Sequence, residues 1–312
     1  MPKSEIKTPF GSETVITQHI SEADLKTYFV GFDLGEYRWD PLIGKLLNAL
    51  VDFAFGYHDG ILTNTYNREK LKEAAKAIYK IDPYDSTNHE HKKYRDEDDF
   101  FEKKYGRRGE FGELILHLLL RDFHNTICLL SKVFFKDADG ITVHGFDAVH
   151  IHAPSKSLWL GESKLHASGS SGVKELTQDI MKHFERDYLL REFALISKKR
   201  NFYADSSVIP DKDRWFDLID VDNTLENILE SVTIPLLCTY TSEVFNKHNS
   251  EKTAEFVCEY ENEMRALKKY FDDHRSSPIK TDLRIILLLF PVPNKNVLLK
   301  KLHEKLSYIQ KI

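Results

Sequence analysis

The chain has 312 residues, of which 41% are hydrophobic and 30% are charged, and its 44 Lys and Arg against 49 Asp and Glu give a net charge of −5. This composition is ordinary for a soluble globular protein, and the length is sufficient for one large domain or two small ones. The charge argues against a stand-alone nucleic-acid binder, which usually carries a basic excess. A nucleic acid would therefore meet a local basic surface, or a partner protein would deliver it.

The cysteines and the N-terminal segment indicate in which cellular compartment the protein is expected. Cys128, Cys238 and Cys258 are odd in number and widely spaced, which suggests neither a disulfide framework nor a zinc site. The opening MPKSEIKTPFGSE lacks an apolar signal region, and the longest apolar run, residues 285–290, is too short to span a bilayer. We expect a cytoplasmic protein with no membrane role.

The first third of the chain predicts helices but carries no chemical motif. Apolar spacing indicates a helix over 41–54, and a second, lysine-rich helix is expected over 70–80. A polar segment at 82–104 is the best candidate for a boundary. We therefore predict an N-terminal α/β region of unknown role at 1–95 and a second unit at 96–312, or one continuous domain.

A helix over 109–124 is apolar around most of its circumference, and we expect it to be buried. Glu110, Glu113 and His117 form its remaining polar stripe at helical spacing. A glutamate in the first turn either complements the helix dipole or belongs to a site.

The segment 139–166 predicts two strands joined by a turn near residue 155. Side chains alternate along a strand, so Glu162 and Lys164 share a face of the second strand, and Asp147 on the first strand lies opposite or diagonal to them. Gly161 leaves the backbone open to close approach by a ligand or another chain. Two carboxylates and an ammonium therefore converge.

Such a trio suits metal-assisted hydrolysis of phosphodiesters. The carboxylates of Asp147 and Glu162 are the hard oxygen ligands that Mg²⁺ prefers, with Mn²⁺ as a substitute. Lys164 would orient or help to deprotonate the attacking water and offset the charge that builds up. The alternative is a salt-bridged patch on a solvated sheet face, because short motifs have high false-positive rates.

The sequences GFD at 145–147 and GESK at 161–164 resemble the PD-(D/E)xK, or restriction-endonuclease-like, nuclease superfamily. The resemblance implies a core with a central mixed sheet flanked by helices, and it makes the unit at 96–312 a nuclease domain with a C-terminal α/β extension. It also implies a Glu four residues after Gly109, which is Glu113, as a further metal ligand, and Gln178 on the following helix as a catalytic residue. In the exonuclease-like branch a tyrosine follows that glutamine by four residues, whereas this chain has Lys182.

More narrowly, the segments RRGEFGELILHLLL, GFDAVH and GESKLHAS are similar to the HamA family of nuclease subunits from the Hachiman anti-phage defence system. This resemblance implies a metal-dependent DNA nuclease, the effector of a bacterial defence system, that acts with the helicase subunit HamB. The alternatives are a stand-alone restriction or repair nuclease and a non-catalytic scaffold subunit. Substrate preference, an RNA target, exo- or endonucleolytic cutting, oligomeric state and trigger stay open.

Beyond the hairpin, we expect a small-residue loop at 167–172, a helix over 173–196, strands at 232–240 and 283–290, and helices at 251–272 and 297–309. Pro291 and Pro293 should end the second of these strands. Basic side chains around these elements either meet a phosphate backbone or form a solvated face. They are Arg107, Arg108, Lys174, Lys182 and Arg186.

Overall fold

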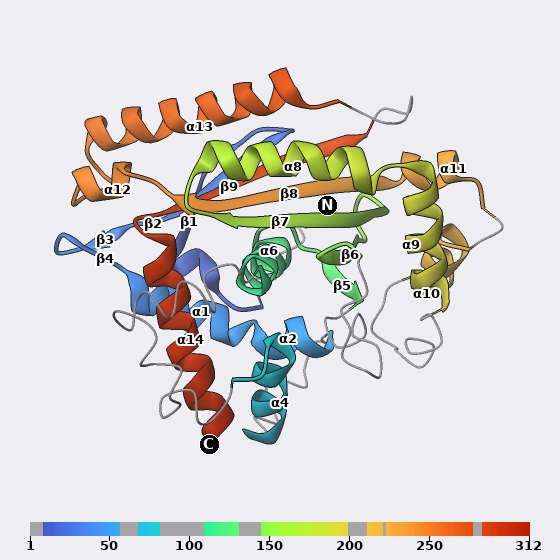
Figure 1. The fold of residues 1–312 in the computed structure, drawn as a ribbon, viewed down its shortest axis with the longest axis horizontal. Helices are drawn as coiled ribbons and strands as arrows, with labels where there is room; N and C mark the ends of the chain where they lie inside the picture. Colours follow the sequence, from blue (N-terminus) through green and yellow to red (C-terminus); the bar gives the residue numbers. More distant parts are fainter. Residues whose placement is uncertain are drawn as a thin grey trace, which may run out of the picture.

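A seven-stranded sheet with helices on both faces forms the centre of the molecule (Figure 1). The computed structural model describes residues 9–56, 68–81, 109–130, 145–198, 211–220, 223–276 and 283–312. The predicted α/β class, with a central mixed sheet flanked by helices, is confirmed. The boundary predicted near residue 95 lies outside the described residues. Across those ranges, no helix combines the length and the apolar character that crossing a membrane requires.

The sheet is mixed, with its parallel part in the centre. In spatial order its strands are β1 (Ile16–Ser21), β2 (Leu25–Val30), β9 (Arg284–Val292), β8 (Val232–Thr241), β7 (Ser157–His166), β6 (Ala148–His152) and β5 (Ile127–Leu130). Strands β2, β9, β8 and β7 pair in parallel, and the outer pairs are antiparallel. Both β8 and β9 are buried strands in the centre of the sheet, and the strands predicted at 232–240 and 283–290 are confirmed. Pro291 does not end β9, because it still pairs with Tyr240.

Helices form a layer on each face of the sheet (Figure 1). One layer consists of α1 (Trp39–Asn48), α2 (Leu50–Phe55), α4 (Arg68–Ile78), α6 (Glu110–Phe123) and α14 (Lys295–Lys311). The other consists of α8 (Gly169–His183), α13 (Ala254–His274) and the short α12 (Val244–Lys247), with α9 (Arg186–Lys198), α10 (Lys212–Leu218) and α11 (Leu225–Glu230) beside one end of the sheet. A small ribbon of β3 (Phe32–Asp33) and β4 (Glu36–Tyr37) and the 3-10 turn η1 (Ser12–Thr14) complete the described elements.

Two of the expected elements differ from the structure. The predicted helix over 41–54 is two helices that meet at Ala49. The expected loop at 167–172 is largely wrong, because α8 already begins at Gly169, where the hydroxyl of Ser168 accepts the N–H of Ser171 as an N-cap. The single helix expected over 173–196 is divided between α8 and α9.

The buried helix α6 packs closely against β7 because two glycines leave room for it. A Cβ at Gly161 would lie 2.9 Å from Cδ2 of Leu116 and 3.2 Å from Cβ of Ala148, and one at Gly112 would lie 3.2 Å from Oγ of Ser163. The close approach expected at Gly161 is therefore made by α6 and not by a ligand or another chain.

Buried carboxylates tie neighbouring segments to α6. Asp122, near its C-terminal end, accepts the backbone N–H groups of Phe10 at 3.1 Å and Ser12 at 2.8 Å. Asp52 of α2 is completely buried and accepts from Nε of Arg121 at 2.8 Å. The N-terminal segment and α2 are therefore fixed to the helix that carries Glu113.

We expect Gly161→Val to lower the free energy of unfolding by about 1–3 kcal/mol, because its side chain would overpack the contact between α6 and β7. Gly44 is a helical glycine whose added Cβ meets nothing within 4 Å. Gly44→Ala should therefore raise the free energy of unfolding by up to about 1 kcal/mol. Chemical denaturation measures both changes, and a Gly161→Val variant as stable as the wild type would contradict this packing.

Candidate active site

The β6–β7 hairpin places Asp147 beside Glu162. The turn at residues 153–156 joins the strands, as predicted, and Ala148 pairs with Gly161, so the next position brings Asp147 level with Glu162. Ser163 donates its backbone N–H and its hydroxyl to Oδ2 of Asp147, each at 2.8 Å. The carboxylate of Asp147 is thereby held across the end of the hairpin.

Glu162 and Lys164 point to the face of the sheet that α8 covers. They follow Leu158 and Leu160, which belong to the core on that face, at the strand period of two. Glu162 is 3% exposed, so a solvated ion-pair patch is the wrong description of this residue.

Two side chains of α8 contact Glu162 and Lys164. Nδ1 of His183 lies 2.7 Å from Oε1 of Glu162, and Nζ of Lys164 lies 2.6 Å from Oδ2 of Asp179. Because both partners come from one helix, the position of α8 sets the geometry of the cluster.

The cluster raises the pKa of Glu162 well above its ordinary value. Burial is the largest cause, followed by repulsion from Asp147 and then Asp179, while Lys164 opposes the rise and Glu113 adds the smallest repulsion. Burial in turn lowers the pKa of His183. A divalent cation among these carboxylates would relieve their repulsion and displace the proton, so the donor set fits a hard metal ion.

Lys164 remains an ammonium in this environment. Burial by itself lowers its pKa, but the ion pair with Asp179 and the charge of Glu162 outweigh burial, and the pKa is raised. The raised pKa favours a role in orienting water and stabilising negative charge over a role as a base.

His183 lies in an aromatic pocket that fixes its ring. The ring stacks on Tyr188 with centroids 4.6 Å apart and an interplanar angle of 11°, and Phe146 meets both rings edge-on. Glu192, which interacts electrostatically with His183, is 4% exposed, and burial raises its pKa to about 7. His183, Tyr188 and Glu192 were not among the residues predicted from the sequence.

The structure does not bring every predicted residue to the cluster. Glu113 is 8% exposed in the first turn of α6 and adds repulsion to Glu162. Gln178 is exposed on α8, and the adjacent Asp179 makes the contact with Lys164 instead.

The structure describes three of the five basic residues predicted to contact phosphates. Lys174, Lys182 and Arg186 are exposed, as a surface for phosphates requires. Arg107 and Arg108 lie outside the described residues. Contact of any of them with nucleic acid stays a prediction.

Helical periodicity contained a signal for the missed partners. Asp179 and His183 follow the buried Leu176 at three and seven residues, the spacing of one helix face. The resemblance to nucleases favoured Gln178, which lies about 100° away around the helix from Asp179.

The fold and the cluster define a mixed α/β protein with buried carboxylates and a lysine on its central sheet. The model of the HamA family matches residues 8–306. The chain therefore belongs to the HamA family, which confirms the family predicted from the sequence. Neither the curated proteins nor the solved structures gave a match.

We expect Mn²⁺ to bind more tightly as the pH rises, with release of protons, because the metal ion binds the deprotonated carboxylate of Glu162. The sign follows from the raised pKa of Glu162, because a proton on this carboxyl competes with the metal ion and the competition weakens as the pH rises. Titration calorimetry in two buffers of different ionisation enthalpy measures the affinity and the protons released. Glu162→Gln should lose the proton release, and an affinity independent of pH in the wild type would contradict the assignment.

Proposed function

We propose that this HamA-family protein is a Mg²⁺-dependent deoxyribonuclease with a restriction-endonuclease-like core. The observation that carries the proposal is the arrangement of the buried Glu162 and the partly exposed Lys164 on one face of β7, with Asp147 level with Glu162 at the end of the hairpin. A helix precedes the hairpin and another follows it, on opposite faces of the sheet, which is the order that the nuclease resemblance implies (Figure 1).

Each residue of the cluster has a role that its contacts support. Asp147 and Glu162 would hold the metal ion, and Glu113 would support it from α6. Bound Mg²⁺ would polarise a phosphate oxygen and activate a water molecule. Lys164, held by Asp179, would orient that water and stabilise the negative charge that develops on the phosphate. His183 would hold Oε1 of Glu162 in position through its Nδ1 contact of 2.7 Å.

We also propose that the nuclease is the effector of a Hachiman anti-phage defence system and acts with the helicase HamB. Membership of the HamA family supports this role. The net charge of −5 is consistent with delivery of the DNA by a partner.

Two alternatives make different predictions. A stand-alone restriction or repair nuclease would cut DNA fully without a helicase. A non-catalytic scaffold would not depend on the chemistry of Glu162 and Lys164, so Glu162→Gln and Lys164→Ala would keep the biological activity of the wild type.

The purified chain, with and without HamB, should cleave DNA only with Mg²⁺ or Mn²⁺ and not with EDTA. We expect Glu162→Gln to abolish cleavage and Lys164→Ala to reduce it by about 100-fold or more, since these residues act on the metal and on the developing charge. Gel assays of plasmid and linear DNA measure the rates. Lys247→Ala and Glu259→Gln, which remove an exposed ion pair of 3.3 Å, are the matched controls and should cut normally.

The same assay separates the two neighbouring residues of α8. Asp179→Asn should slow cleavage about 10-fold to 100-fold because it frees Lys164 from its position, whereas Gln178→Ala should have little effect. If Glu162→Gln and Lys164→Ala cut as the wild type does, or no condition gives cleavage, the nuclease proposal fails.

A further inference from the structure

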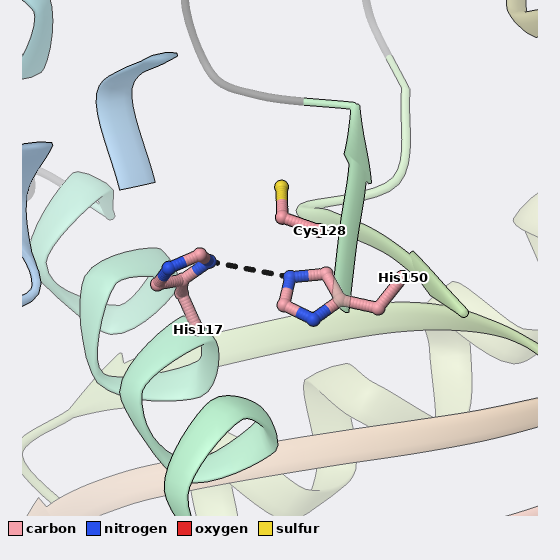
Figure 2. A group of neighbouring side chains, drawn as sticks. All are labelled: His117, Cys128 and His150. Atoms are coloured by element: carbon pink, nitrogen blue, oxygen red, sulfur yellow. Dashed lines mark hydrogen bonds between the residues drawn. The ribbon is translucent and has the colours of Figure 1, made fainter. Parts of the chain in front are cut away.

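A second cluster of metal-binding side chains lies on the opposite face of the sheet from Glu162. Figure 2 shows His117 of α6 pointing towards Cys128 of β5 and His150 of β6. One ligand atom from each residue lies within 4.8 Å of the other two, and His117, Cys128 and His150 are 2%, 7% and 1% exposed. Among the described residues, this is the group with the composition of a zinc site.

The fold sets the three residues up independently of any ion. Cys128 and His150 are directly paired across β5 and β6, so their side chains share a face, and a register shift in β5 follows at Leu130. His117 lies one helical turn after Glu113 on the helix that packs on that face. The rings of Phe10 and Phe53 pack against His117 and close the cluster from solvent.

The hydrogen bonds of His150 fix its tautomer. The hydroxyl of Thr126 donates to the carbonyl oxygen of Leu120 at 2.9 Å, so towards Nδ1 of His150, 2.8 Å away, it acts as an acceptor. Nδ1 of His150 therefore carries the proton, and Nε2 presents a lone pair towards Nδ1 of His117, 3.2 Å away. That lone pair is free to bind a metal ion.

His117 is better satisfied with a metal ion than without one. Its buried Nε2 makes no hydrogen bond and lies 3.7 Å from Oδ1 of Asp52. If Nδ1 of His117 donates to His150, Nε2 has two possible states, and both are unfavourable. A neutral ring directs the lone pair of Nε2 at the carboxylate of Asp52. A protonated ring adds a second buried positive charge beside Arg121, which already pairs with Asp52. If Nδ1 instead binds a cation, Nε2–H points to Asp52, the carboxylate–histidine–metal arrangement of many zinc sites.

We propose that His117 Nδ1, His150 Nε2 and the Cys128 thiolate bind a zinc ion as three of its four ligands, with a water molecule in the fourth position. The thiol of Cys128, which donates to the carbonyl oxygen of Leu130 at 3.1 Å, would release its proton to solvent when the ion binds. Nitrogen ligands around tetrahedral zinc are about 3.3 Å apart, and nitrogen and sulfur ligands about 3.6 Å apart. The 3.2 Å between the two histidines matches this geometry, and Cys128 needs to move by about 1 Å at most to complete it. The ion would fasten α6 to β5 and β6, the elements that position Glu113 and Asp147.

The experiment is metal analysis of the full chain, freed of any affinity tag and dialysed against Mg²⁺ and a chelating resin. Mass spectrometry should find about one zinc ion per chain in the wild type, in Glu162→Gln and in Cys258→Ser, which removes an exposed cysteine as the matched control. Cys128→Ser should lose most of the zinc. Retention by Glu162→Gln separates this site from the proposed nuclease metal.

Cobalt substitution gives a readout that does not depend on whether Cys128→Ser folds. The wild type loaded with Co²⁺ should show a sulfur-to-cobalt charge-transfer band in the near ultraviolet, and chelation should lower its melting temperature. A folded wild type with little zinc and no such band would overturn the proposal. Bound zinc without the band in the cobalt form would equally overturn it, since the ion would then lie away from Cys128.

Discussion

The burial of one carboxylate constrains the arrangement of the whole candidate site. Glu162 lies within the sheet beside the central strand β8 and is covered by α8. A buried ionisable group must be paired, protonated or bound to a metal, because losing its hydration is costly. His183 meets this requirement directly, and the charge of Lys164 meets it in part. The rotation of α8 is therefore fixed with Asp179 and His183 turned inward.

The sequence predicted the parts of the fold that depend on local pattern. Apolar residues identified the strands β8 and β9. The turn signal and the alternation of side chains identified the β6–β7 hairpin, and they placed Asp147 opposite or diagonal to Glu162. Contacts between elements distant in the chain were not predictable from one sequence. The pairing of Cys128 with His117 and His150 needs the register of β5 on β6 and the packing of α6, so widely spaced cysteines gave no indication of zinc.

Helix α6 connects the two clusters. Glu113 and His117 are one turn apart on it, and Asp147 and His150 are three residues apart around the start of β6. Gly112 and Gly161 allow this helix to lie close against β7. A shift of α6 along the sheet would therefore disturb both clusters together, so the proposed zinc ion would affect the proposed nuclease metal without any contact between them.

The measurement that tests the central claim most directly is anomalous X-ray diffraction from crystals soaked in Mn²⁺. The account predicts an anomalous peak between the carboxylates of Asp147 and Glu162, close to Lys164, and its loss in Glu162→Gln crystals. Full occupancy by Mn²⁺ at another place, with none between these two carboxylates, would contradict it.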